Sequence, residues 1–133
     1  MKISLITIVF FSVIIAGCKK NNASLVGTWS FNTQREILKT SNVTTFDTTV
    51  NMGSGTMVTF TSGGKYNTTG TIGLDSGTYA QNSGKLTLNS ASGSTPMVML
   101  INLLSDHNLT LEQRDTGSSV PVTTAQYIFN LSR

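Results

Sequence analysis

Apolar and polar side chains alternate along most of the sequence from residue 25 onward, and turn-forming clusters interrupt the alternation. The clusters, such as Ser62-Gly63-Gly64 and Asn82-Ser83-Gly84, recur roughly every 8–12 residues, which is typical of all-β domains. No window of helical length keeps an apolar stripe at positions i, i+3 and i+4. We therefore expect an all-β fold of eight or nine antiparallel strands in up-and-down order. Closing such a sheet into a β-barrel would remove its exposed edges.

The expected strands differ in how clearly the sequence defines them. Residues 34–40 either continue the first strand after a bend or form a short helical turn. Residues 97–104 are apolar on both faces, so we expect this strand to cross the best-covered part of the sheet. The expected strands are residues 25–31, 44–51, 56–61, 65–72, 77–81, 85–88, 97–104, 109–114 and 123–133.

The N-terminus carries an apolar run that ends at the only cysteine of the chain, Cys18. The run, residues 3–16, has the length of a signal-peptide core, whereas a membrane-spanning helix needs roughly twenty apolar residues. The segment Ile15-Ala16-Gly17-Cys18 resembles the lipobox of bacterial lipoproteins. Two alternatives are a buried thiol after an ordinary secretory signal and a short signal anchor. A lone cysteine also leaves no intrachain disulfide.

The lipobox resemblance implies a domain organisation and a location. Residues 1–17 would be the lipoprotein signal peptide, residues 18–24 a tether lipidated at Cys18 with fatty acids such as palmitate, and residues 25–133 the folded domain. Several acyl chains hold a protein stably on a bilayer, so the membrane would be a partner through the N-terminal lipid. Lys19 follows the cysteine in place of aspartate, and no acidic residue comes soon after it. By resemblance, this favours the cell envelope, at the outer membrane and facing the periplasm.

Charge is balanced once the predicted signal and tether are set aside. The chain has nine basic and six acidic residues, and Lys2, Lys19 and Lys20 precede the domain, which leaves six of each from Leu25 onward. Nucleic-acid binding requires a concentrated basic face, and none is visible, so we expect no nucleic-acid partner. Lys19 and Lys20 suit either anionic lipid headgroups or a solvated tether.

No pattern in the domain indicates catalysis. His107 is the only histidine, which excludes a multi-histidine metal site within one chain, and we expect it to be a solvated turn residue. The serines have no base at a recognisable spacing, and Glu112 and Asp115 do not form a facing pair. We expect no enzyme, no catalytic residue, no metal site and no cofactor.

Several short segments resemble one family. Leu25-Val26-Gly27-Thr28-Trp29 is similar to the Gly-x-Trp opening strand of lipocalin-like domains, and residues 60–66, 76–79 and 109–111 resemble later strands of small Bacteroidetes-type lipocalin-like lipoproteins. The resemblance implies a lipocalin-like barrel that is plugged at one end by Gly27, Trp29 and a basic residue stacked on the indole. Arg133 is our candidate for that residue, with Arg114 and Arg35 as alternatives. The chain is shorter than full-length lipocalins and shows no clear helix after its last strand.

The other end of such a barrel would admit a small hydrophobic ligand. We expect a monomeric, lipid-anchored ligand-binding protein of the cell envelope. The alternative is a barrel filled by its own side chains, which would act through its outer surface as a structural, interaction or inhibitor protein. The aromatic and methionine residues would then simply form the core. The candidate pocket-lining residues are Phe31, Met57, Phe60, Tyr66, Tyr79, Met97, Met99, Tyr127 and Phe129.

Overall fold

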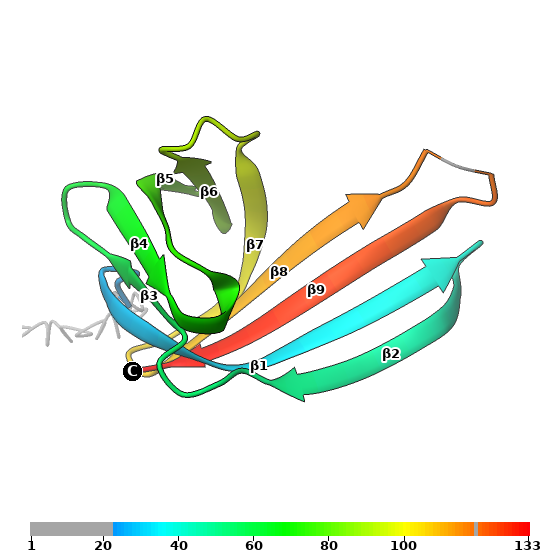
Figure 1. Ribbon diagram of the computed structural model, residues 1–133, viewed down its shortest axis with the longest axis horizontal. Coiled ribbons are helices and arrows are strands. Elements are labelled where there is room, and N and C mark those ends of the chain that lie inside the picture. Colours follow the sequence, from blue (N-terminus) through cyan, green and yellow to red (C-terminus); the bar gives the residue numbers. More distant parts are fainter. Residues whose placement is uncertain (1–22, 119) are drawn as a thin grey trace, which may run out of the picture.

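The computed structural model describes residues 23–118 and 120–133, and strands dominate them (Figure 1). The predicted signal peptide and Cys18 lie outside these residues. Within the described part, no helix is long and apolar enough to cross a membrane. The elements are β1 (Gly27–Thr40), β2 (Val43–Asn51), β3 (Met57–Phe60), β4 (Lys65–Thr69), the 3-10 turn η1 (Gly70–Ile72), β5 (Asp75–Asn82), β6 (Lys85–Ser90), β7 (Met97–Leu104), β8 (Asn108–Thr116) and β9 (Thr123–Ser132).

The strands form one antiparallel sheet that closes on itself. The sheet order is β2-β1-β3-β4-β5-β6-β7-β8-β9, and the additional pairing of β1 with β9 joins the ends. Eight strands, β1 and β3 to β9, therefore make a closed up-and-down barrel of the lipocalin-like type, and β2 is an extra strand beside β1. The predicted fold class is confirmed.

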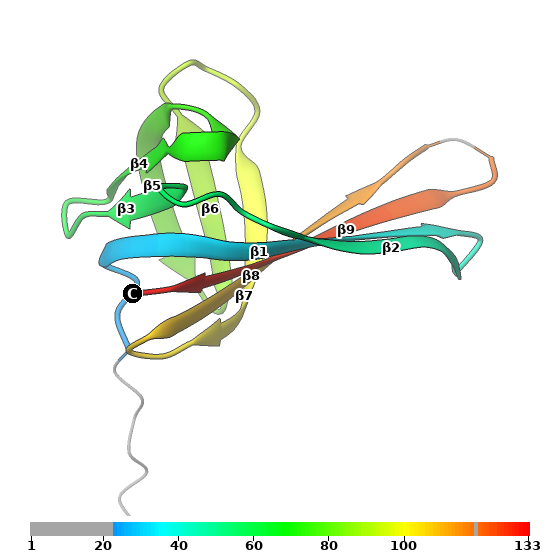
Figure 2. The ribbon, with the colours of Figure 1, turned by 60° about the horizontal axis from the view of Figure 1, so that its bottom comes forward.

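Three barrel strands, β1, β8 and β9, continue beyond the barrel and form an extension together with β2 (Figures 1 and 2). The first residues of β1 pair with β3, from Gly27 opposite Phe60 to Ser30 opposite Met57. From Thr33 onward β1 pairs with β2 instead, while β9 follows it on the other side. The extension is thus built from β2, the second half of β1, β9 and the end of β8. Residues 34–40, which the sequence left open between strand and helical turn, are strand.

A bulge at Asn32 marks the change of partner. Phe31 lies opposite Leu131 and Thr33 lies opposite Asn130, so Asn32 is an extra residue on β1. Its carbonyl accepts a hydrogen bond from the Met52 amide. Because side chains alternate between the two faces of a strand, one extra residue reverses which side chains face inward. Glu36 and Leu38 therefore share a face with the barrel interior, through the pairs Glu36–Tyr127 and Leu38–Ala125.

The core lies toward the end of the barrel where β1 starts. Its fully buried large side chains include Trp29, Phe60, Leu86, Leu109 and Leu131. The prediction for β7 needs correction: Val98 and Leu103 are about half exposed, at 51% and 48%. The outer face of β7 faces solvent because the barrel is a single layer, so only the inward side, with Met99, is buried.

Candidate functional site

Gly27, Trp29 and Arg133 meet at the end of the barrel where the chain enters it. Trp29 is fully buried, and its Nε1 donates to the Leu25 carbonyl at 2.8 Å. The Arg133 guanidinium lies over the indole with its Cζ 4.3 Å from the ring centroid, which is cation–π distance. Of the three arginines considered from sequence, the structure places Arg133 on Trp29.

Gly27 is needed in this arrangement because its backbone leaves no room for a side chain. Its φ is +136°, and a Cβ here would lie 2.8 Å from Nη1 of Arg133. The same guanidinium donates from Nη1 to the Val26 carbonyl at 2.7 Å and from Nε to the Asp106 carbonyl at 2.6 Å. These contacts tie both chain ends of the barrel together and close this end, which we call the closed end.

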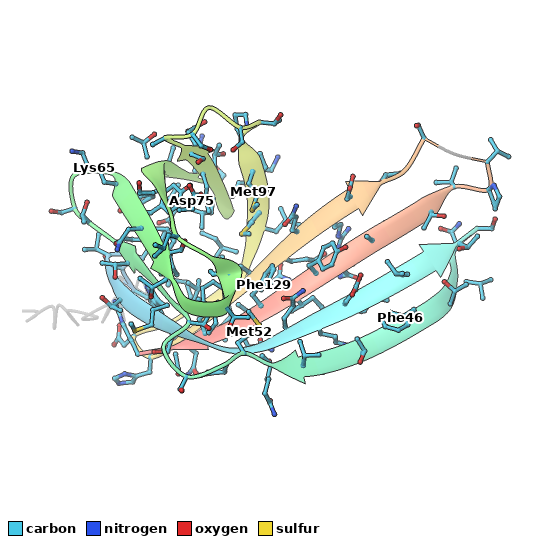
Figure 3. The ribbon with its side chains drawn as sticks, in the orientation of Figure 1. Phe46, Met52, Lys65, Asp75, Met97 and Phe129 are labelled. Atoms are coloured by element: carbon cyan, nitrogen blue, oxygen red, sulfur yellow. The ribbon has the colours of Figure 1, made fainter. Side chains whose placement is uncertain are left out.

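The opposite half of the barrel contains an apolar cavity of about 180 Å³. A water molecule takes up about 30 Å³ of liquid, so the cavity exceeds a few water volumes. Its wall reaches the extension at Gln113 and Phe129, which pair with Tyr127 and Gln34 of the extension strands. Figure 3 shows Phe129 at this junction and Asp75 and Met97 in the barrel. We call this side of the cavity, which faces the extension, the mouth. The lining residues are Phe31, Val58, Phe60, Tyr66, Thr68, Ile72, Asp75, Leu88, Met97, Met99, Leu111, Gln113 and Phe129.

Six of the nine predicted pocket residues line this cavity: Phe31, Phe60, Tyr66, Met97, Met99 and Phe129. The structure corrects the other three. Met57 faces outward, because its neighbours Val58 and Phe60 are the inward residues of β3. Tyr79 faces inward but packs edge-to-face on Phe60, and its hydroxyl donates to the Thr61 carbonyl. Tyr127 is the next residue of β9 on the same face as Phe129, but it lies on the extension, where it pairs with Glu36.

Sequence reasoning missed seven lining residues, which fall into three groups. Val58, Leu88 and Leu111 are apolar strand residues of the inward parity, so alternation counted from Phe60, Leu86 and Leu109 could have found them. Ile72 lies in η1, a 3-10 turn that replaces the end of the strand expected over residues 65–72, so strand alternation does not predict its direction. No sequence signal singled out the polar residues Thr68, Asp75 and Gln113, because only closure of the barrel brings them to one opening.

Asp75 carries the charge of the cavity wall. Its Oδ2 accepts from the Tyr66 hydroxyl at 2.6 Å, and its Oδ1 accepts from the Ser90 hydroxyl at 2.6 Å and from the Ser76 amide at 2.9 Å. The bond from Ser90, and then that from Tyr66, holds the pKa of Asp75 below its ordinary value. Burial first, and then the hydrogen bond to Asp75, raises the pKa of Tyr66 to about 12.

The other residues considered from sequence lie away from the cavity. His107 is exposed in the turn before β8. Glu112 and Asp115 occupy opposite faces of β8, because Glu112 pairs with Ile128 and Asp115 with Ala125. Among residues 23–118 and 120–133, no group of three or more His, Cys, Asp or Glu side chains is placed to hold a metal ion. The cavity itself is an apolar chamber with one hydrogen-bonded carboxylate, that of Asp75, in its wall.

Comparison with protein-family models, with curated proteins and with solved structures finds no significant match to this chain.

Proposed function

We propose that the protein is a lipid-anchored binding protein of the bacterial cell envelope whose barrel holds a small, mainly apolar ligand. The observation that carries this proposal is the cavity of about 180 Å³, which is open at the mouth and lined mainly by apolar side chains. An engineered apolar cavity of about 150 Å³ is large enough to bind benzene. Such a space supports binding by the interior more than it supports a filled barrel acting through its surface.

The proposed anchor rests on the lipobox-like segment that ends at Cys18. The described chain starts at Ala23, and β1 begins at the closed end. A lipid on Cys18 would hold the barrel by this end, with the mouth and the extension at the opposite end. A ligand could then reach the cavity from the aqueous side. The proposed place is the outer membrane, with the domain in the periplasm, and the resemblance to lipocalin-like lipoproteins agrees with it.

Ligand binding is tested with toluene, a neutral apolar probe small enough for the cavity. We expect toluene to shift the methyl NMR signals of Met97 and Met99, which line the cavity. Leu88→Phe should weaken toluene binding at least tenfold, because the larger ring occupies part of the chamber. Leu103→Phe is the matched control on the outer face of β7 and should leave binding unchanged. Absence of any methyl shift at saturating toluene would contradict the proposal.

The anchor is tested separately with Cys18→Ser. We expect this variant to lose fatty-acid labelling in growing cells and to accumulate as unprocessed precursor or released protein, because serine offers no thiol for diacylglyceryl transfer. Continued labelling of the variant would refute lipidation at Cys18. Protease treatment of intact cells tests the side of the membrane, and digestion of the domain from outside would contradict the periplasmic location.

A further inference from the structure

We propose that the ligand of this cavity is a small cationic amphiphile, with its apolar body inside the barrel and an ammonium group at Asp75. This inference rests on the proposed binding function and names its ligand class. The apolar cavity defines the site, and the charges around its mouth define which ligand it prefers.

The first reason is the state of Asp75. Among the described residues that line the cavity, it is the only one with a charged side chain. Its three donors are a phenol, a hydroxyl and a backbone amide, all of them neutral. Neither ion pair in the described part of the chain involves Asp75. The carboxylate is therefore held in place without being neutralised. Its Oδ2 receives one hydrogen bond and can accept another.

The second reason is the charge on the sheet face that continues outward from the mouth. Cross-strand partners share a face of a sheet, so the pairs Gln113–Tyr127 and Tyr127–Glu36 place Glu36 on the cavity side of the extension. The pair Asp115–Ala125 places Asp115 on the same face. The approach to the cavity from the extension therefore also carries acidic groups.

The basic residues of the described domain point elsewhere. Arg35 and Lys39 pair with Ile128 and Thr124, which belong to the outer face of β9, and Arg114 pairs with Gln126 on that face. Lys65 and Lys85 flank the inward residues Tyr66 and Leu86 and so point outward. Arg133 is at the closed end. A domain with equal numbers of acidic and basic residues thus presents acidic groups to anything that enters the mouth.

An ammonium group suits this arrangement better than a hydroxyl or a carboxylate. It can donate to the free acceptor position on Asp75, and hydrogen bonds between charged groups are roughly twice as strong as neutral ones. A carboxylate ligand would face like charges with no cation to offset them. The apolar chamber takes the hydrocarbon part in all three cases, so the charge of the head group should decide the affinity.

The test compares three probes that share one ring and differ in the head group: phenethylamine, 2-phenylethanol and phenylacetate. Each is titrated into the purified full-length protein at pH 7, and binding is followed through the methyl NMR signals of Met97 and Met99. We expect phenethylamine to bind at least about tenfold tighter than 2-phenylethanol, which corresponds to about 1.4 kcal/mol. Phenylacetate should bind weakest.

Two variants of matched charge assign the effect to its residue. Asp75→Asn should bring the affinities for the amine and the alcohol within about twofold of each other, while Asp106→Asn, which makes the same change at the closed end, should keep the preference. Equal binding of amine and alcohol by the unmodified protein would overturn the cationic ligand and leave the cavity function intact. Failure of all three probes to shift the methyl signals would overturn both. If Asp75→Asn does not fold, the comparison of the three probes still decides the inference.

Discussion

At the scale of single residues, Trp29 is the side chain on which the closed end depends. It is fully buried, its indole N–H is satisfied by the Leu25 carbonyl, and its face is covered by the Arg133 guanidinium. The ring therefore contributes burial of a large apolar surface, a buried hydrogen bond and a cation–π contact. The cation–π contact adds at most about 2 kcal/mol, so the packing of the ring is the larger contribution.

Replacing this side chain should destabilise the protein strongly. We expect Trp29→Ala to lower the free energy of unfolding by about 3–5 kcal/mol, a large share of the stability of a small domain. Trp29→Phe should cost much less, because most of the buried ring area is kept. Urea denaturation of both variants measures the difference. Trp29 is the only tryptophan, so the tryptophan emission reports on this residue alone. Because the ring is buried, that emission should be blue-shifted and resistant to quenching by iodide. A red-shifted, readily quenched emission would show that the ring faces water.

At the scale of elements, the pairing of β5 with β6 leaves no room for a side chain at Gly77. Gly77 lies opposite Ser90, and a Cβ on it would come within 1.9 Å of the Asn89 carbonyl oxygen. That oxygen belongs to the backbone of the neighbouring strand and cannot rotate away. Gly77 lies two residues after Asp75 on β5, and the Ser90 hydroxyl opposite Gly77 donates a hydrogen bond to the Asp75 carboxylate. The close approach of the two strands at Gly77 therefore helps to position the wall of the cavity.

The glycines of the β3–β6 region allow a matched test of this close approach. We expect Gly77→Ala to destabilise the protein by about 1–3 kcal/mol, the range typical of overpacking, and to weaken amide-exchange protection in β5 and β6. Gly63→Ala is the control, because the nearest atom to a Cβ there is the Thr61 hydroxyl at 3.8 Å, and it should change stability by less than about 0.5 kcal/mol. Equal stability of the two variants would mean that β5 and β6 lie farther apart than described.

At the scale of the whole molecule, two carboxylates, Asp75 and Glu112, lie on opposite faces of the sheet. Each is the centre of its own cluster of hydrogen-bond donors. Asp75 faces inward, whereas Glu112 faces outward and is 5% exposed. Glu112 accepts hydrogen bonds from Asn102, Gln126 and Arg114. Burial alone would raise the pKa of Glu112, but the hydrogen bonds from Asn102 and Arg114 and the charge of Arg114 outweigh burial, so the pKa is lowered. Asn102 reaches this cluster from a bulge in β7.

These lowered pKa values predict how stability depends on pH. A carboxyl whose pKa is lower in the folded state stabilises the fold above its unfolded pKa, and this contribution is lost as the pH falls through the folded pKa. Asp75 and Glu112 both belong to this class. We therefore expect stability to be flat from pH 7 to about 5 and to decline below the ordinary carboxyl pKa of about 4. Chemical denaturation at several pH values measures the decline.

Glu112→Gln separates the outer cluster from the remaining carboxyls. The variant should be less stable than the unmodified protein at pH 7, because Arg114 loses its charged partner. Its stability should decline less between pH 5 and pH 3, because glutamine does not titrate. An identical decline in both proteins would show that Glu112 does not contribute to acid sensitivity.

The sequence by itself determined the class of fold and most of the closed end. Period-two alternation and Gly-rich turns predict antiparallel strands in up-and-down order, because both signals are local to a few residues. Trp29 and Phe31 share a parity, and so do Phe129, Leu131 and Arg133, so the inward-facing residues of these two barrel strands could be identified without knowing the sheet. Most of the apolar pocket residues follow from the same rule.

Tertiary structure alone decided where the mouth of the cavity lies and which charges surround it. Counting by twos from Trp29 would place Arg35 inside and Glu36 outside, whereas the bulge at Asn32 reverses both assignments. The bulge occurs where β1 leaves β3 and pairs with β2, a change of partner that depends on residues distant in the sequence. Asp75, Tyr66 and Ser90 likewise meet only because β4, β5 and β6 are neighbours in the closed sheet. Alternation is a local property of the chain, but register is set between strands, and register selects the residues of this site.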